Sequence, residues 1–315
     1  MESITLSSYA KLNLGLNVLG KRRDGYHDIE TVLQAVSLSD SVKVELGPED
    51  LEVQCDRPEV PKRERNLAYR AAQEFVRRAK LNVGARITIE KRIPLGGGLG
   101  GASSNAAAVL IALNLLTGRR LAKEELASAG AELGSDVPFF LCGGTALARG
   151  RGEFLDCSLP TPPLYFVIVY PNFPISTEWA YSRIDESMAG PGTSLADQIE
   201  RRGARFSLTG YTFSANMMAE AIRAGALSQI AANLGNSFEE VVFQTYPELS
   251  KIKEELISSG VLGASLSGSG SSLFGICEGE NGAQRISHSL GQSGHWVKAV
   301  KALSREESFE SGDLA

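Results

Sequence analysis

Five glycines occupy six consecutive positions in "PLGGGLGG", residues 94 to 101, and the chain then continues as an apolar helix pattern. Glycine loses more conformational freedom on folding than any other residue, so such a cluster indicates that something approaches the backbone closely. The first amide groups of a helix lack internal partners and carry the positive end of its dipole, so they attract anions. The stretch therefore predicts a loop that presents a helix N-terminus to a phosphate group.

Two familiar phosphate motifs fit this loop only in part. Gly96, Gly98 and Gly101 match the GxGxxG dinucleotide fingerprint, and residues 85–93 before them alternate as a strand does. That fingerprint also needs a second strand ending in an acidic residue about twenty positions on, where this chain reads as helix. Gly96 and Gly101 also have P-loop spacing, but Ala102 stands where the P-loop lysine belongs. A flexible turn needs fewer glycines. We therefore predict a phosphate loop of neither standard type.

Size and charge fit an enzyme that works on a small molecule. A chain of 315 residues exceeds the usual size of one domain, which predicts two domains. The net charge of -5 gives no general attraction to nucleic acid or to an anionic membrane, so phosphate binding must be local. No apolar run approaches the roughly 18 residues of a membrane span, and the chain begins as strand without a leader.

The cysteine and histidine content argues against a structural metal or a disulfide framework. The chain has four cysteines without a CxxC pair and three histidines. This scatter predicts neither a zinc site nor disulfides, and it favours a reducing cytoplasm.

The first strand carries a second signal. In "AKLNLGLNV", residues 10–18, leucines alternate with polar residues, so Lys11 and Asn13 project from one face. An edge strand with a solvated polar face explains the pattern equally well. Residues 29–38 and 41–46 then read as two strands separated by a turn at Ser39-Asp40.

Two further positions combine a possible function with a plain structural alternative. Tyr26 and His27 follow the tight turn Asp24-Gly25, where an aromatic ring can stack on a planar base and an imidazole can read its edge. Asp136 lies at a helix boundary beside apolar residues, where it is either a helix cap or a positioned catalytic acid.

The second half of the chain has a different residue pattern. The Pro-rich residues 158–163 mark the predicted domain boundary. A second Gly/Ser loop, "SLSGSGSS" at 265–272, lies between two strand-like runs, where it forms either an anion-binding nest or a strand bend. Residues 304–315 are polar and predict a frayed tail.

Three of these stretches together resemble a known superfamily. "AKLNLGLNV", "PLGGGLGGASSNAA" and "LSGSGSSLF" look like the three motifs of the GHMP kinases, which include galactokinase, homoserine kinase and mevalonate kinase. The resemblance covers about residues 5–303 and is thin between 180 and 235. It implies an α+β fold with an active cleft between an N-terminal domain like domain 2 of ribosomal protein S5 and a ferredoxin-like C-terminal domain. We place these domains at 1–160 and 161–303, with the polar tail at 304–315.

Within the superfamily, "GYHDIETVLQAVSLSD" and "LGSDVPFFLCGGTALARGRGE" resemble one branch closely. That branch uses ATP and Mg²⁺ to phosphorylate the 2-hydroxyl of a methylerythritol carried on CDP, in the non-mevalonate (MEP) isoprenoid pathway of the bacterial cytoplasm. The resemblance implies the same cofactors, substrate and location here.

The resemblance also assigns residues. The family's catalytic pair falls on Lys11 and Asp136, where Asp136 takes or orients the proton of the acceptor hydroxyl and Lys11 stabilises charge. The ATP-phosphate loop falls on Pro94, Leu95, Gly96, Gly97, Gly98, Leu99, Gly100, Gly101, Ala102, Ser103 and Ser104. Further nucleotide contacts fall on Asn66, which otherwise reads as a helix N-cap, and on Lys91. The cytosine contacts fall on Asn13, Tyr26, His27 and, by a loose alignment, Tyr181.

Three other functions stay open at this point. An NAD-dependent oxidoreductase would use GxGxxG but lacks its second strand and acid. A nucleotide-binding protein without catalysis would not need both Lys11 and Asp136. A mevalonate-type or other small-alcohol kinase would not need the segment "GYH" to bind cytosine. The oligomeric state, the metal-binding side chain and regulation leave no signal in the sequence.

Overall fold

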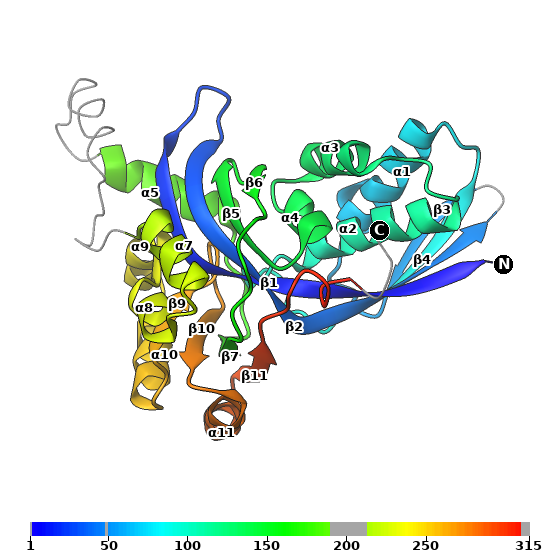
Figure 1. The fold of residues 1–315 in the computed structure, drawn as a ribbon. Helices are drawn as coiled ribbons and strands as arrows, with labels where there is room; N and C mark the ends of the chain where they lie inside the picture. The colour runs from blue at the N-terminus through cyan, green and yellow to red at the C-terminus, as the bar shows by residue number, and fades with distance from the viewer. Residues whose placement is uncertain (1, 48–49, 190–212, 310–315) are drawn as a thin grey trace.

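The computed structural model describes residues 2–47, 50–189 and 213–309 (Figure 1). Two β-sheets organise the chain, and a long antiparallel hairpin runs from one into the region of the other. Within these ranges no helix has the length and apolar character needed to cross a membrane.

The hairpin consists of β1 (Ser3–Lys21) and β2 (His27–Gly47), which pair along almost their whole length. The predicted turn at Ser39-Asp40 is wrong, because β2 continues through both residues. Opposite them, the pairing register between β1 and β2 shifts between Tyr9 and Ala10. Asp40 is tolerated inside a strand because its carboxylate accepts hydrogen bonds from Lys91 and from the backbone amides of Arg92 and Ile93.

The first sheet has seven strands in the order β3-β4-β2-β1-β8, with β5 paired to β2 and β6 paired to β5. The interpretation of a solvated polar face on β1 is wrong, because Lys11 and Asn13 are both buried. Helices α1 to α4 pack together beside β1 and β2 and share one apolar core with them. The remaining elements of this part are β3 (Leu51–Cys55), α1 (Leu67–Ala79), β4 (Gly84–Glu90), α2 (Gly101–Leu116), α3 (Lys123–Leu133), α4 (Val137–Cys142), β5 (Thr145–Gly150), β6 (Phe154–Asp156) and β8 (Gly235–Asn236).

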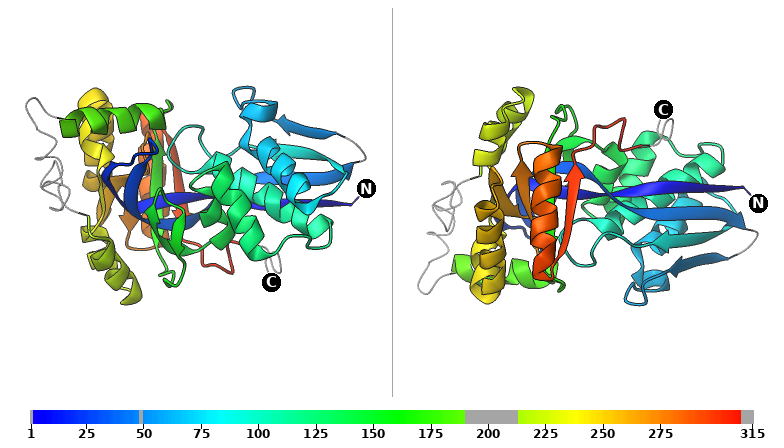
Figure 2. Two further views of the ribbon diagram at one scale, coloured as in Figure 1. Left: turned by 90° about the horizontal axis from the view of Figure 1, so that it is seen from above. Right: turned by 90° about the horizontal axis from the view of Figure 1, so that it is seen from below.

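The second sheet is antiparallel, with the order β11-β7-β10-β9 (Figure 2). This is the strand order of a ferredoxin-like βαββαβ unit. The elements of this part are β7 (Tyr165–Tyr170), α5 (Thr177–Ala189), α7 (Ala215–Arg223), α8 (Leu227–Ala232), α9 (Phe238–Thr245), α10 (Pro247–Ser258), β9 (Gly263–Leu266), β10 (Leu273–Cys277), α11 (Glu280–Leu290) and β11 (Trp296–Lys301). Short 3₁₀ turns occur at Arg63–Arg65 and Gly291–Ser293.

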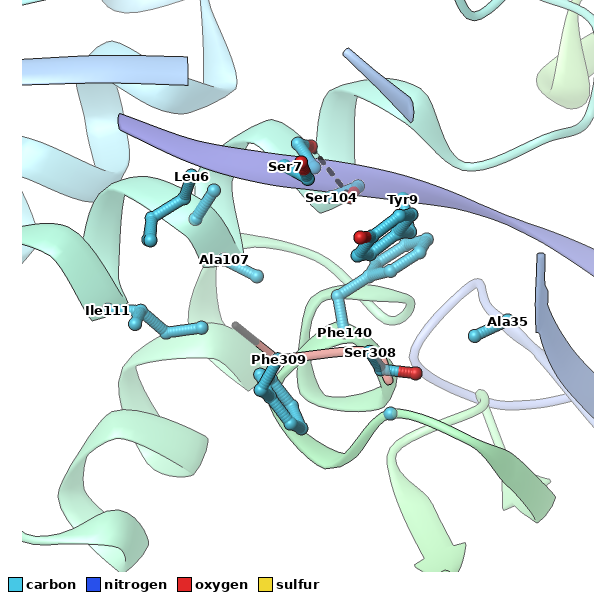
Figure 3. Close-up of a pocket in the computed structure, with 13 residues that line it drawn as sticks. Leu6, Ser7, Tyr9, Ala35, Ser104, Ala107, Ile111, Phe140, Ser308 and Phe309 are labelled. Atoms are coloured by element: carbon cyan, nitrogen blue, oxygen red, sulfur yellow. Dashed lines mark hydrogen bonds between the residues drawn. The ribbon is translucent and has the colours of Figure 1, made fainter. Parts of the chain in front are cut away.

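The start of the C-terminal segment is not frayed, contrary to the sequence prediction. Residues 304–309 fold back onto the first part of the chain, where the Ser308 hydroxyl accepts a hydrogen bond from the Gly144 amide at 3.1 Å. Ser308 and Phe309 line a small cavity of about 30 Å³ together with Tyr9, Ser104 and Phe140 (Figure 3). The polar composition of this segment did not predict the contact, although Phe309 packs against the first apolar core.

Candidate active site

The three motif segments converge on the glycine-rich loop. The Leu99 carbonyl accepts a hydrogen bond from the Lys11 amide at 3.0 Å, which ties the loop to β1. The Gly97 carbonyl accepts from the Ser272 amide and the Gly98 carbonyl from the Ser267 hydroxyl, each at 3.1 Å. Segments about 170 residues apart in sequence therefore hold one loop.

Glycine is required in this loop for two separate reasons. Gly96, Gly98 and Gly100 all have φ between +64° and +75°, a region that other residues rarely adopt. In addition, a Cβ atom on Gly98 would lie 2.0 Å from the Ser267 carbonyl oxygen, and one on Gly100 would lie 3.0 Å from the Lys11 Cγ. The glycines thus allow three backbone segments to approach one another.

The loop leads directly into the N-terminus of α2. The Ser104 amide donates to the Gly100 carbonyl at 2.9 Å, and the amides of Gly101, Ala102 and Ser103 precede it in the first turn. Such first-turn amides have no partner within their own helix, so they suit an anion. Of the two serines, Ser104 is buried and accepts a hydrogen bond from the Ser8 hydroxyl, whereas Ser103 is partly exposed.

Lys11 and Asp136 meet beside this loop. The Lys11 Nζ lies 3.8 Å from the Asp136 Oδ2 and donates a 2.5 Å hydrogen bond to the Asn13 side chain. Burial lowers the pKa of Lys11, and the charge of Asp136 opposes that shift. A Cβ atom on Gly268, from the second Gly/Ser loop, would lie 3.3 Å from the Lys11 Nζ, so all three motifs meet at this lysine.

Asp136 stands at the N-cap position of α4, but its side chain makes no capping hydrogen bond. The carboxylate is 39% exposed, whereas the Lys11 side chain is 5% exposed. The capping interpretation is therefore wrong. The structure leaves an accessible carboxylate paired with a buried ammonium group, an arrangement suited to handling a proton on a bound hydroxyl.

Of the predicted base-binding residues, Asn13 lies beside Lys11, whereas Tyr26, His27 and Tyr181 lie at the turn end of the hairpin. Tyr26 is 53% exposed, and the Arg151 guanidinium lies 4.6 Å from the centre of its ring. His27 is buried and stacks on Tyr181 of α5, with ring centres 4.5 Å apart and planes inclined by 24°. Burial, with a smaller effect from the Asp136 charge, raises the pKa of Tyr181, so its hydroxyl stays neutral.

Two residues that sequence reasoning missed contact this group. Asp185 of α5 accepts a hydrogen bond from the His27 Nε2 at 2.7 Å and from the Lys21 Nζ at 2.6 Å. Although burial raises the pKa of Asp185, these two hydrogen bonds bring it below its usual value. The only sequence signal was the helical spacing of four between Tyr181 and Asp185.

Asn66 and Lys91 both have structural partners. The Asn66 side chain accepts from the Ala68 amide at 2.9 Å and so caps α1, as its alternative role predicted. Lys91 is buried, pairs with Asp40 and donates to Asn105 at 3.2 Å. A Cβ atom on Gly101 would lie 3.0 Å from the Lys91 Nζ, so this lysine lies against the start of α2.

The described residues contain no group of three or more His, Cys, Asp or Glu side chains that could hold a metal. The prediction that the cysteines form no disulfide is wrong, because Cys142 and Cys157 are bonded. These two residues meet because the chain leaves α4 at Cys142 and returns through the β5–β6 hairpin to Cys157.

Comparison with known families covers both parts of the chain. The model of the GHMP kinases N terminal domain matches residues 66–144, and that of the GHMP kinases C terminal matches residues 218–295. The first match contains the glycine-rich loop and Asp136, and the second contains the Gly/Ser loop.

Individual relatives match almost the whole chain. A 4-diphosphocytidyl-2-C-methyl-D-erythritol kinase from Geobacter metallireducens is 39% identical and aligns over 96% of this chain and all of its own. The protein of the same name from Moorella thermoacetica is 40% identical over 92% of this chain and 95% of its own. A crystal structure of 4-(cytidine 5'-diphospho)-2C-methyl-D-erythritol kinase superimposes with a TM-score of 0.76, at 35% identity, and covers 95% of this chain and 99% of its own.

Proposed function

The chain belongs to the GHMP kinase family, and from that premise we propose that it phosphorylates 4-diphosphocytidyl-2-C-methyl-D-erythritol. It transfers a phosphoryl group from ATP to the 2-hydroxyl, giving the 2-phosphate and ADP, as the kinase step of the MEP pathway. Relatives at this level of identity and coverage carry the name of this kinase. The observation that carries the mechanism is the Lys11–Asp136 pair at the meeting point of the three motifs.

Phosphoryl transfer depends mainly on alignment and charge stabilisation. Asp136 is accessible, so the acceptor hydroxyl donates its hydrogen bond to this carboxylate and is oriented toward the phosphate. Lys11 is fixed by Asn13 and buried beside the loop, so its positive charge lies next to both the carboxylate and the transferring group.

The phosphates of ATP bind at residues 94–104, on the first-turn amides of α2. Magnesium, when bound with ATP, would neutralise charge on the phosphates. The Ser103 hydroxyl, the more accessible of the paired serines, would hold the ion together with the phosphate oxygens. Asn66 supports the adenine end from the start of α1, and Lys91 supports the nucleotide from beside the start of α2.

The cytosine base binds at the hairpin end. Tyr26 offers an exposed ring for stacking, and His27 reads the edge of the base, with Tyr181 behind it. Asn13 links this end to Lys11 through its hydrogen bonds to Lys11 and Thr31. A bacterial cytoplasm supplies both ATP and the substrate of this pathway, so we place the enzyme there.

A substrate panel tests this proposal. ADP release is followed with magnesium and ATP in the presence of the cytidylyl substrate, mevalonate or homoserine. We expect release with the cytidylyl compound alone. Release with another alcohol instead would retain the kinase and overturn the substrate, and an absence of release with all three would overturn the enzymatic function.

A further inference from the structure

Helix α5 contacts His27 with two side chains that are one helical turn apart. Tyr181 stacks on the imidazole ring at 4.5 Å between ring centres, and Asp185 accepts from its Nε2 at 2.7 Å. Residues at this spacing lie on one face of a helix. The ring of His27 is therefore fixed both in its plane and in its rotation by one helix.

Lys21 completes the arrangement from β1. Its Nζ lies 2.6 Å from the Asp185 Oδ2, whereas His27 contacts the Oδ1, so each carboxylate oxygen has its own donor. Asp185 remains a carboxylate at neutral pH, because these hydrogen bonds outweigh the effect of burial on its pKa. An ionised carboxylate can only accept hydrogen bonds, so the Nε2 of His27 must donate.

This hydrogen bond determines what the other ring nitrogen can do. In a neutral imidazole one nitrogen donates and the other accepts, and the partner of one nitrogen decides which. Within the described residues, the Nδ1 of His27 has no hydrogen-bond partner. With the proton held on Nε2, Nδ1 is an acceptor that a bound ligand can use.

We propose that Asp185, oriented by Lys21, makes the enzyme selective for cytosine over uracil by holding His27 as the tautomer protonated on Nε2. The Nδ1 atom then accepts a hydrogen bond from the 4-amino group of cytosine. Uracil carries an oxygen at position 4, which would face this acceptor without a proton between them. Asp185 is thus a positioning residue, and the inference rests on the proposed function for the identity of the base.

The Asp185→Asn variant should invert this selectivity. Its side chain has one oxygen and one amino group, and the Lys21 ammonium attracts the oxygen. The amino group then faces His27 and donates to Nε2, so the proton moves to Nδ1. The ratio of kcat/KM for the CDP ester over the UDP ester of methylerythritol should fall by about tenfold or more, the usual consequence of a mismatched buried hydrogen bond.

A double variant separates this mechanism from structural damage. In Asp185→Asn with Lys21→Met, no cation orients the amide, so its oxygen can turn toward His27 and restore the original tautomer. We expect the preference for the CDP ester to recover. Glu186→Gln is the matched control, because Glu186 is the neighbouring exposed acid of α5 and pairs with Arg183 instead. Its ratio should equal that of the unmodified enzyme.

The tautomer is measured directly by ¹⁵N NMR of the histidine rings, which is practical with three histidines in the chain. We expect His27 to be protonated on Nε2 in the unmodified enzyme and on Nδ1 in Asp185→Asn. The same tautomer in both proteins, a doubly protonated ring, or an unchanged CDP/UDP ratio would overturn the inference. If the unmodified enzyme phosphorylates neither ester, the proposed function fails, and the affinities for CDP and UDP then test the tautomer separately.

Discussion

The phosphate end and the base end of the site are built in different ways. At the phosphate end, backbone atoms of three motifs contact one another, and a Cβ on Gly98 would lie 2.0 Å from a carbonyl oxygen. At the base end, side chains from β1, β2 and α5 meet around His27, and Tyr26 remains 53% exposed. Recognition by backbone requires a fixed loop, whereas recognition by side chains requires several separate elements to be positioned.

This difference suggests how each end tolerates change. A substitution in the phosphate loop alters the path of the chain, so it affects both ATP binding and packing. A substitution at the base end removes one contact, so it affects one substrate. The Lys11–Asp136 pair lies beside the phosphate end and, in the proposed mechanism, acts on both substrates, so its loss should have the largest effect.

Asp136→Ala tests the role of the pair. We expect turnover to fall by about a hundredfold or more, because the variant lacks the carboxylate that is proposed to accept the hydrogen bond of the acceptor hydroxyl. The affinity for ATP, measured by calorimetry, should stay nearly unchanged. Asp156→Ala is the control, because Asp156 is an exposed carboxylate at the end of β6. Near-normal turnover in Asp136→Ala would remove this residue from the mechanism.

The pH profile tests the charge of Lys11. Burial holds its pKa below 10.5, so kcat/KM should fall as pH rises through that lowered value, by about tenfold per pH unit. The free energy of unfolding changes with pH in the opposite direction. Between the folded-state and the unfolded-state pKa of Lys11, the unfolded chain binds the extra proton, so folding becomes more favourable as pH rises. The contribution of Lys11 to stability therefore does not cause the loss of activity, which circular dichroism at each pH can check. A profile that stays flat to pH 10.5 would contradict this assignment.

Gly98→Ala tests the backbone end. The new methyl group has no room beside the Ser267 carbonyl, and the residue has φ +75°, so the loop must move. We expect ATP affinity to fall by about tenfold or more, since displaced amides no longer converge on the phosphates. Gly118→Ala is a matched control, with φ +78° and no atom within 4 Å of the new Cβ. An equal loss of ATP affinity in the two variants would show that strain, and not the contact with Ser267, explains the effect, and an unchanged affinity in Gly98→Ala would contradict the prediction.

Tyr26→Ala tests the side-chain end. Removing a stacked ring should raise the KM of the cytidylyl substrate by about tenfold, as expected for the loss of stacking on one base, and leave that of ATP nearly unchanged. Tyr26→Phe keeps the ring and should restore the KM. If the KM values of both substrates rise equally in Tyr26→Ala, the two ends are not separate.

The same difference explains what the sequence could predict. The phosphate loop is contiguous in sequence, and its glycines predict close backbone contacts even when the contacting segments are not known. Lys11 and Asp136 were predicted because they lie within segments that resemble motifs of the family. Asp185 and Lys21 were missed because a single acid on a helix and a single lysine on a strand carry no pattern until the fold places them together.

The sequence predictions that the structure contradicts failed for similar reasons. Asp40 predicted a turn because aspartate is rare inside strands. Its burial is acceptable because the Lys91 side chain, 51 residues away, and the amides of Arg92 and Ile93 donate to its carboxylate. The Cys142–Cys157 bond and the docking of residues 304–309 also depend on contacts between distant segments. The local amino-acid composition therefore does not predict such contacts.

The most direct test of the proposed phosphoryl transfer follows the phosphorus signals of the substrates and products. With magnesium, ATP and the cytidylyl substrate, ³¹P NMR should show the γ-phosphate of ATP replaced by the signals of ADP and a new phosphomonoester, while the diphosphate of the CDP group stays intact. Formation of inorganic phosphate alone, or loss of the CDP diphosphate, would contradict transfer to the 2-hydroxyl.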